Sequence, residues 1–257
     1  FWDTEKIMLR GVIITLDDVT DRVNLEKERK KQEKLAALGE MAARVAHELR
    51  NPISVLGGFI KRLEKNIDNP ESGKKYVNII KEEILRLEQI VNEILDFSRE
   101  PRALEFTTFN INKLINDVYI LHEDKIREKN ILFSLETESE EIIVYAEYSR
   151  IKQVIINLLQ NAIEATPNNG KILVETKTKF DRVVVSVWNE GTPIDKDTAD
   201  KLFAPFFTTK VHGTGLGLAI CKKIVEDEHK GKIYHEATED GNRFTIEIPK
   251  EMPKEIS

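Results

Sequence analysis

Residues 35–63 read LAALGEMAARVAHELRNPISVLGGFIKRL, and a seven-residue repeat runs through the whole stretch. Apolar side chains occupy both the a and the d positions of that repeat, at Leu35, Leu38, Ala42, Val45, Leu49, Pro52, Leu56, Phe59 and Leu63. Such a stripe predicts a helix that packs along one seam. His47 falls at position f, so we expect its ring to face away from the seam and to be exposed to solvent.

The neighbours of His47 favour a chemical role over that of a plain surface histidine. Glu48 follows directly, Asn51 lies one turn further on the same face, and Pro52 interrupts the helix. A proline inside a helix removes one backbone hydrogen bond, here to the carbonyl of Glu48, and costs roughly 3 kcal/mol. It also disfavours helical angles at Asn51. We therefore expect a kink or a loosened turn beside His47; the alternative is a long helix that merely tolerates its proline.

A second helix is predicted after the turn residues 66–70, with Asn69 as its cap and Pro70 at its first position. Its apolar residues are spaced alternately three and four apart, at Val77, Ile80, Ile84, Leu87, Val91 and Ile94. Two antiparallel helices with such narrow stripes cannot enclose a core by themselves. The sequence therefore favours a homodimer in which two hairpins form a four-helix bundle. Packing of one hairpin against the later part of the same chain is the alternative.

The segments on either side of the hairpin have different patterns. Residues 1–20 read as one or two strands that cannot fold alone, which suggests the tail of another domain, and residues 21–34 read as a charged connector helix. Pro101 closes the hairpin. After it we predict helices at 111–129, 149–165, 196–202 and 215–228, and strands at 131–135, 142–145, 171–177, 183–188, 232–236 and 243–249. The predicted class is α+β: a helical hairpin followed by a two-layer α/β sandwich.

The composition narrows the range of functions. The chain has 257 residues, of which 40% are hydrophobic and 33% charged, and these values are typical of a soluble protein. A net charge of -6 argues against nucleic acid as the main partner. The single cysteine, Cys221, excludes an internal disulfide and suits a reducing compartment.

No stretch of the sequence approaches the roughly 18 apolar residues of a membrane span. We expect no membrane contact within this chain and a cytoplasmic location. Because the sequence begins at Phe1 without a methionine, we also expect it to be a fragment, and a membrane anchor upstream of it is left open.

A row of amide side chains recurs in the helix predicted near 149–165. Gln153, Asn157 and Asn161 are four residues apart and share one face, while apolar side chains fill the opposite face. Asparagine is a poor helix former, and half-buried amides need hydrogen-bond partners. The row is either a hydrogen-bonded polar stripe or a set of oxygen ligands for magnesium, an ion that binds together with substrate phosphates.

A glycine-rich segment, Gly213-Thr214-Gly215-Leu216-Gly217, leads into the last predicted helix. Backbone N–H groups at a helix start, unobstructed by side chains, can bind phosphate oxygens. Residues 206–210 precede this segment and add an aromatic anchor, two hydroxyls and, at Lys210, one positive charge suited to a phosphate. We expect Val211 and His212, between the two segments, to form a short lid without a catalytic role.

In combination these segments resemble a known family, the sensor histidine kinases of two-component systems. The H-box is matched by residues 46–52, the N-box by 157–162, the F-box by 203–210 and the G2-box by 213–217. The resemblance extends over about residues 21–250. In addition, Asp18-Val19-Thr20 is similar to the end of a PAS sensor domain.

The resemblance implies a division of the chain into three parts. Residues 1–20 would be the end of a PAS-like domain, and residues 21–102 a signalling helix with the dimerisation and histidine phosphotransfer domain. Residues 103–257 would be an ATP-binding domain of the Bergerat type, also called GHKL.

The resemblance also implies a role for each matched residue. His47 would be the phosphoacceptor, whose neutral ring nitrogen attacks the γ-phosphorus of ATP, and Glu48 would orient the other ring nitrogen. Asn161 would coordinate Mg²⁺, and Asn157 would support the phosphates. The glycine-rich segment would wrap around the phosphates, and Lys210 would contact the γ-phosphate.

The implied partner is the receiver domain of a response regulator, which would accept the phosphoryl group on an aspartate. Glu48 together with Asn51 also matches the pattern linked to dephosphorylation of the regulator, in which Asn51 would position a water. We therefore expect a bifunctional protein. Whether a subunit phosphorylates itself or its dimer partner depends on the handedness of the hairpin loop, which the sequence does not reveal.

One motif departs from the family. The G1-box normally reads Asp-x-Gly-x-Gly, whereas this chain has Asn189-Glu190-Gly191-Thr192-Pro193. The family's aspartate accepts a hydrogen bond from the adenine amino group. Asn189 can still accept through its amide oxygen, although without a charge. We therefore expect adenine to bind at Asn189 and Gly191 with weakened affinity.

Two other classes of function compete with the kinase. A plain ATPase of the wider gyrase and chaperone superfamily would use the second domain alone, but it leaves His47 and Glu48 unexplained. A non-catalytic dimerising scaffold is favoured only by the altered G1-box. Protein labelling from γ-labelled ATP, with the acid lability of phosphohistidine, would separate the three.

Overall fold

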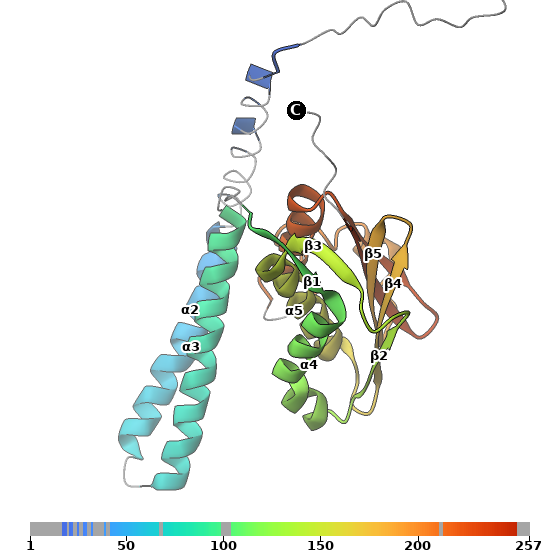
Figure 1. Cartoon of the computed structure of the whole chain (residues 1–257). Helices are drawn as coiled ribbons and strands as arrows, with labels where there is room; N and C mark the ends of the chain where they lie inside the picture. The colour runs from blue at the N-terminus through green and yellow to red at the C-terminus, as the bar shows by residue number, and fades with distance from the viewer. Residues whose placement is uncertain are drawn as a thin grey trace, which may run out of the picture. The chain divides into compact units, whose positions relative to one another are not determined.

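The protein is described here by a computed structural model (Figure 1). It describes residues 42–66, 69–98, 104–210 and 213–250, together with scattered positions between 17 and 39. The contacts within the chain divide it into two units, residues 1–40 and residues 41–257. The strands predicted before residue 17 and the predicted closing turn at Pro101 lie outside the described residues. The described positions between 21 and 39 are helical, as predicted.

The helical hairpin consists of α2 (Ala42–Lys65) and α3 (Pro70–Ser98), which run antiparallel to each other (Figure 1). The Asn69 side chain accepts a hydrogen bond from the Ser72 N–H (3.2 Å), so it caps α3 as predicted. Helix α2 continues on both sides of Pro52. Pro52 is buried and the other described a and d positions from residue 45 onward are half-buried, which confirms the seam. The rings of Phe59 and Tyr76 join the two helices across it, 5.7 Å apart.

Only every second residue of the predicted apolar stripe of α3 is covered by the rest of the chain. Ile80, Leu87 and Ile94 are half-buried, whereas Val77, Ile84 and Val91 are 42–45% exposed. On α2, Ile53 and Ile60 are also exposed. A single hairpin therefore leaves a row of its aliphatic side chains uncovered.

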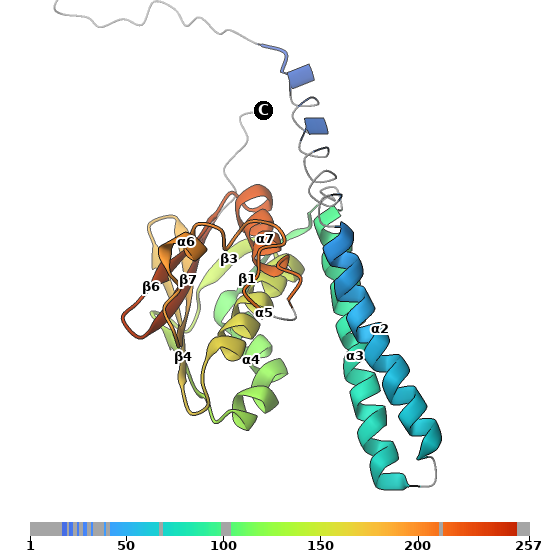
Figure 2. The ribbon, with the colours of Figure 1, turned by 180° about the vertical axis from the view of Figure 1, so that it is seen from behind.

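The second part of the chain is a two-layer sandwich, as predicted. Its strands are β1 (Phe106–Asn110), β2 (Leu132–Thr137), β3 (Ile143–Glu147), β4 (Lys171–Lys179), β5 (Arg182–Glu190), β6 (Lys232–Ala237) and β7 (Gly241–Pro249). Its helices are α4 (Ile111–Glu128), α5 (Tyr148–Ala165), α6 (Lys196–Ala199), α7 (Gly217–Lys222) and the π-helix η1 (Lys223–Glu228). Five strands form a mixed sheet in the order β2-β4-β5-β7-β6, and β1 pairs with β3 in a small second sheet. Helices α4, α5 and α7 lie on one side of the large sheet (Figure 1, Figure 2).

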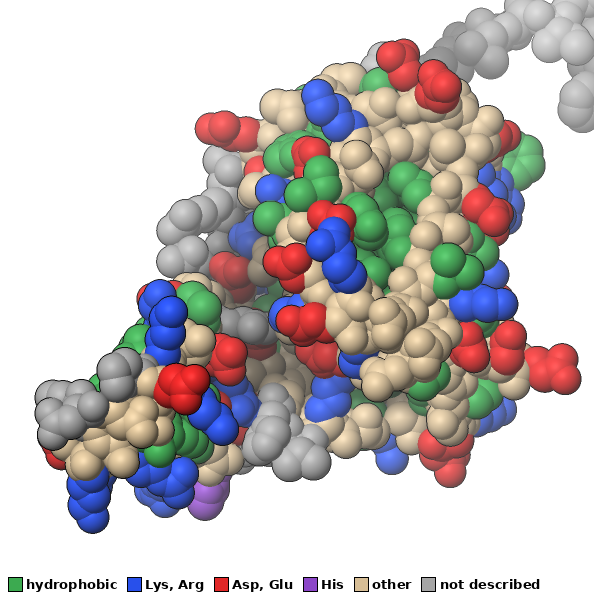
Figure 3. Space-filling view, turned by 90° about the horizontal axis from the view of Figure 1, so that it is seen from below, with side chains coloured by type: hydrophobic (Ala, Val, Ile, Leu, Met, Phe, Trp, Pro, Cys, Tyr) green, Lys and Arg blue, Asp and Glu red, His purple; other side chains and the backbone are tan. Residues whose placement is uncertain are grey.

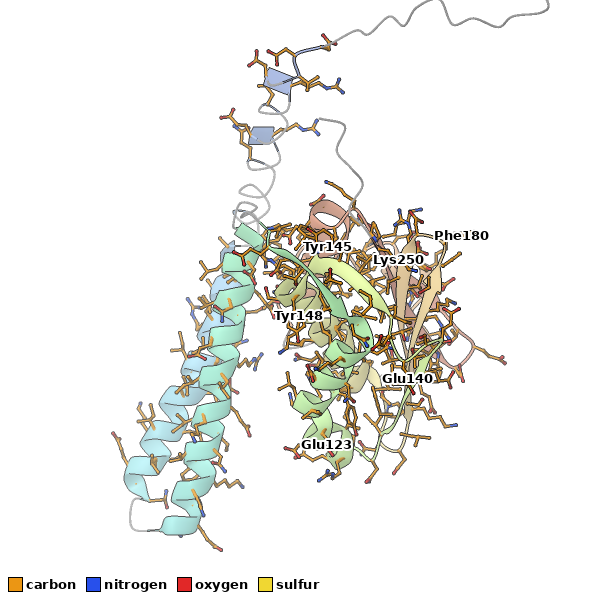
Figure 4. All side chains as sticks on the ribbon, in the orientation of Figure 1. Glu123, Glu140, Tyr145, Tyr148, Phe180 and Lys250 are labelled. Carbon is orange, nitrogen blue, oxygen red and sulfur yellow. The ribbon has the colours of Figure 1, made fainter. Side chains whose placement is uncertain are left out.

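Three details differ from the sequence prediction. Strand β1 was not predicted, and the short helix expected at 196–202 covers only the four residues of α6. The helix expected at 215–228 is present, but its second half is the π-helix η1. At the turn between β4 and β5, the Phe180 side chain points into solvent with 90% of its surface exposed (Figure 4).

The sequence argues against a membrane span and against nucleic acid as the main partner, and two features of the structure bear on these points. Within the described part of the chain, no helix combines the length and the apolar character needed to cross a membrane. On the face shown in Figure 3, the described Lys and Arg side chains are interspersed with Asp and Glu side chains rather than gathered in one basic patch.

His229 joins the end of the π-helix to β3. Its Nε2 accepts a hydrogen bond from the backbone N–H of Glu147 (3.1 Å), so the ring proton lies on Nδ1, which donates to the Ile224 carbonyl (2.8 Å). The ring is 1% exposed. Burial lowers the pKa of His229 below its usual 6.5, and a second ring proton would meet an N–H group that cannot accept it. The native fold therefore keeps this histidine neutral.

We predict that the free energy of unfolding falls as the pH drops below about 6.5, because the unfolded chain binds a proton at His229 that the native fold excludes. One such proton contributes at most about 1.4 kcal/mol per pH unit. Urea unfolding between neutral and mildly acidic pH measures this slope. His229→Gln should reduce the slope.

Glu228→Gln serves as the neighbouring control for this prediction. Burial raises the pKa of Glu228, so its ionisation lowers stability as the pH rises, which is the opposite sign. The acid-induced loss should therefore persist in Glu228→Gln. An unchanged slope in His229→Gln would contradict the assignment.

Candidate functional site

A cavity of about 560 Å³ lies beside the exposed face of α5. Its walls include predicted site residues from three separate segments, Asn157, Asn161, Asn189, Lys210, Gly213, Thr214, Gly215 and Gly217. Apolar side chains, among them Ile194, Leu202 and Phe244, line it as well. The fold therefore brings Asn157 and Asn161 of the amide row, the glycine-rich segment and Asn189 of the altered G1-box together in one site.

Helix α5 presents its amides to this cavity because its opposite face is fixed in the core. Val154, Ile155 and Leu158 are at most 1% exposed beneath the sheet. Asn157 donates from its amide to the Gly217 carbonyl (3.4 Å) and contacts the Cys221 sulfur (3.6 Å), so it joins α5 to α7.

The other amides of the row, and the cysteine, have different environments. The Gln153 amide donates to the Asp96 carboxylate (2.9 Å), and Gln153 does not line the cavity. Burial raises the pKa of the Cys221 thiol to about 12, so this buried cysteine is unreactive.

The glycine-rich segment folds tightly onto the chain at Phe206. Phe206 is 2% exposed and anchors this region as predicted. Gly215 has φ +68°, and a Cβ placed on it would lie 2.5 Å from the carbonyl carbon of Phe206. Leu216 is fully buried, and its N–H donates to the Thr214 hydroxyl (3.2 Å). Helix α7 then begins at Gly217 without a side-chain cap, which leaves backbone N–H groups for an anion.

The end of β5 forms another wall of the cavity. Asn189 is 2% exposed, and its amide N–H donates to the Glu190 carbonyl (3.1 Å). Gly191 passes so close to α5 that a Cβ on it would lie 3.1 Å from the Ala165 carbonyl oxygen. Any larger residue at position 191 would push this wall away from the helix.

Asn242, the β7 partner of Asn189 in the sheet register, holds the following loop. Its amide oxygen accepts the Ile194 N–H (2.9 Å), and its amide nitrogen donates to the Thr192 carbonyl (2.9 Å). Both neighbours of Pro193 are therefore fixed. The sequence gives no sign of this role of Asn242, since a single asparagine at a strand start resembles an ordinary turn residue.

Oxygen atoms on α5 surround the ammonium group of Lys210. Nζ donates to Asn161 Oδ1 (2.6 Å) and forms an ion pair with the Glu164 carboxylate. A site that holds an ammonium ion between an amide oxygen and a carboxylate has the donor types that magnesium prefers. Among the described residues no three His, Cys, Asp or Glu side chains cluster. Magnesium would therefore depend on Asn161 and on oxygens of its substrate, and the donor set fits that use.

The predicted phosphoacceptor lies on the hairpin, outside the residues that line the cavity. His47 and Asn51 are exposed on α2, and Glu48 is half-buried. The exposure of His47 confirms the position f that its heptad predicts. The predicted lid residues, Val211 and His212, lie outside the described residues.

Two family models match separate regions of the chain. The family model of the His Kinase A (phospho-acceptor) domain matches residues 37–102. The model of the histidine kinase-, DNA gyrase B- and HSP90-like ATPase matches residues 146–252. Each of the two regions with predicted chemistry thus matches a family of its own.

Relatives match nearly all of the chain. Sporulation kinase E of Bacillus subtilis is 37% identical over 234 residues, which are 90% of this chain and 31% of that protein. The signal transduction histidine-protein kinase AtoS of Escherichia coli is 32% identical over 93% of this chain and 39% of its own length. The chain therefore spans less than half of these two relatives.

A solved structure with both kinds of domain is also similar. The crystal structure of histidine kinase ThkA in complex with response regulator protein TrrA is 56% identical, with a TM-score of 0.77. The match covers 94% of this chain and 70% of that one.

The close contact at Gly215 leads to a prediction about nucleotide binding. Gly215→Ala would strain a left-handed backbone and press a Cβ against the carbonyl of Phe206, and backbone strain of this kind costs on the order of 1–3 kcal/mol. We expect the affinity for magnesium ADP, measured by calorimetry, to fall by roughly five- to a hundredfold. Gly217→Ala should lose much less, since its Cβ would meet Asn157 at 3.8 Å, an ordinary contact. Equal losses in both variants would contradict this account.

Proposed function

The chain belongs to the sensor histidine kinase family, and from that premise we propose that it transfers the γ-phosphoryl group of ATP to His47 and then to an aspartate of a response regulator. The observation that carries the proposal is the combination of a cavity lined by the glycine-rich segment with an exposed histidine on a packed helix. The similarity to a kinase solved together with its regulator supports the choice of partner.

The cavity offers different environments for the parts of a nucleotide. Ile194, Leu202 and Phe244 give an apolar surface suited to a base. Because the amide N–H of Asn189 is committed to Glu190, its amide oxygen is the group that would accept the adenine amino group. An uncharged acceptor makes a weaker hydrogen bond than a carboxylate, so we expect weaker adenine binding than the usual G1-box gives.

The glycine-rich segment would hold the phosphates. The uncapped start of α7 supplies N–H donors and the positive end of a helix dipole. Asn157 would support the phosphates from α5, and Lys210 would supply a positive charge. Magnesium, held by Asn161, would neutralise further phosphate charge when bound.

At His47 a neutral ring nitrogen would form a bond to the γ-phosphorus while the bond to the β,γ-bridging oxygen breaks and ADP leaves. Glu48, the next residue, would accept the proton on the other ring nitrogen and orient the ring. Positioning and charge neutralisation account for most of the acceleration of such transfers.

Several further assignments belong to the same proposal. The exposed aliphatic row on α2 and α3 supports a homodimer with a four-helix bundle, in which a second hairpin would cover that row.

We assign residues 21–102 to the dimerisation and phosphotransfer domain, residues 103–257 to the ATP-binding domain, and residues 1–20 to the end of a PAS-like domain. A reducing, cytoplasmic location would suit a chain with one buried thiol.

We predict that the protein incubated with γ-labelled ATP and magnesium acquires label that is stable to alkali and lost in acid. His47→Gln should lose this label completely while its affinity for magnesium ADP stays within twofold, because His47 lies outside the cavity. Hydrolysis without labelling would favour a plain ATPase, and the absence of both would favour a scaffold. Either result would contradict the kinase proposal.

Asn51 is exposed on α2 one turn after His47, where its amide would position a water for dephosphorylation of the regulator. We predict that Asn51→Ala slows dephosphorylation of the phosphorylated regulator at least tenfold, while labelling of His47 survives. The measurement follows loss of label from the regulator in the presence of ADP. An exposed site such as Arg50→Ala serves as control. An unchanged rate in Asn51→Ala would remove the second activity from the proposal.

A further inference from the structure

Lys210, the residue expected to contact the γ-phosphate, is already engaged by α5. Its ammonium group donates to Asn161 Oδ1 (2.6 Å) and pairs with the Glu164 carboxylate. Asn161 and Glu164 are three residues apart, so they are neighbours on one face of the helix. The Lys210 N–H also donates to the Thr208 hydroxyl (3.0 Å), which fixes the backbone that carries the side chain.

The carboxylate of Glu164 is itself held in place. Its Oε1 accepts a hydrogen bond from the Gln160 amide (3.0 Å), and its other oxygen faces the ammonium. Gln160 and Glu164 are one turn apart, so the same helix positions both groups. Glu164 is therefore an oriented acceptor for Lys210.

The ammonium of Lys210 occupies the oxygen at which a metal ion would bind. Asn161 Oδ1 is the amide oxygen assigned to magnesium, and an ammonium group 2.6 Å from that oxygen would strongly repel a magnesium ion bound to it. The charges lead to the same conclusion, since one ammonium cannot pair fully with both Glu164 and an incoming phosphate. Lys210 must leave α5 before it can contact the γ-phosphate.

We propose that Glu164 is a positioning residue which, with Asn161, holds Lys210 away from the phosphates until a magnesium-bound nucleotide displaces it. This inference rests on the proposed function. Lys210 then exchanges one anionic partner for another, the carboxylate for the γ-phosphate. Breaking the ion pair costs free energy, so a nucleotide that recruits Lys210 binds more weakly than it would to a preformed lysine contact.

The size of the effect follows from exposure. The side chains of Lys210 and Glu164 are 42% and 44% exposed, and exposed ion pairs contribute little and are screened by salt. We therefore expect Glu164→Gln to tighten magnesium-free binding of a non-hydrolysable ATP analogue by about two- to fivefold at low salt. Binding in the presence of magnesium should tighten by at least as much, because magnesium reaches Asn161 only after Lys210 has left the ion pair, and both gains should shrink at high salt.

The experiment is a double-mutant cycle with Glu164→Gln and Lys210→Met, in which calorimetry measures analogue affinity with magnesium and with EDTA. If Glu164 holds Lys210, the gain from Glu164→Gln disappears in the Lys210→Met background. Glu175→Gln removes the same charge from an ion pair with Arg243 on the sheet, away from the cavity, and should leave affinity unchanged.

Two results would overturn the inference while leaving the proposed function intact. A gain that persists in Lys210→Met would mean that Glu164 only repels phosphate, and no gain at all would mean that it does not restrain Lys210. Failure of the unaltered protein to bind the analogue with magnesium would instead overturn the proposed function, and this inference with it.

Discussion

Helix α5 packs against the sheet with one face and lines the cavity with the other, and the arrangement of the site depends on this packing. One face is sealed against the sheet by aliphatic side chains that are almost completely buried. This burial fixes the rotation of the helix about its own axis. The polar residues on the other face, Asn157, Asn161 and Glu164, therefore point toward the cavity or its rim. Core packing thus determines which oxygen and nitrogen atoms a ligand can reach.

The glycine-rich segment depends on the same core by a different route. Phe206 is buried and has a left-handed φ of 64°, an uncommon conformation for an aromatic residue. Its carbonyl group lies where a side chain on residue 215 would have to be, so only glycine fits there. A buried ring thereby sets the path of the glycine-rich segment. Loop position and helix rotation are both consequences of apolar burial.

Regular patterns made much of the fold predictable. The heptad placed His47 on the exposed side of α2, and the four-residue spacing placed Asn157 and Asn161 on one face of α5. Features that depend on distant partners were missed. Strand β1 contains Thr107 and Thr108 and is a strand only because β3, more than thirty residues later, pairs with it. The π-helix was missed as well, because the six residues of η1 are too few to distinguish a π-helical spacing from an α-helical one.

The same distinction explains what the sequence could reveal about the site. Motif residues were found because their types and spacing are unusual. Asn242 and Glu164 were not, since each acquires its role from a contact with a residue far away in the chain, 48 positions for Ile194 and 46 for Lys210. Whether a charged side chain in the cavity is already paired becomes visible only through such contacts. The sequence predicts that Lys210 contacts a phosphate. In the fold its ammonium group is already paired with Asn161 and Glu164, so its availability depends on what competes for Asn161.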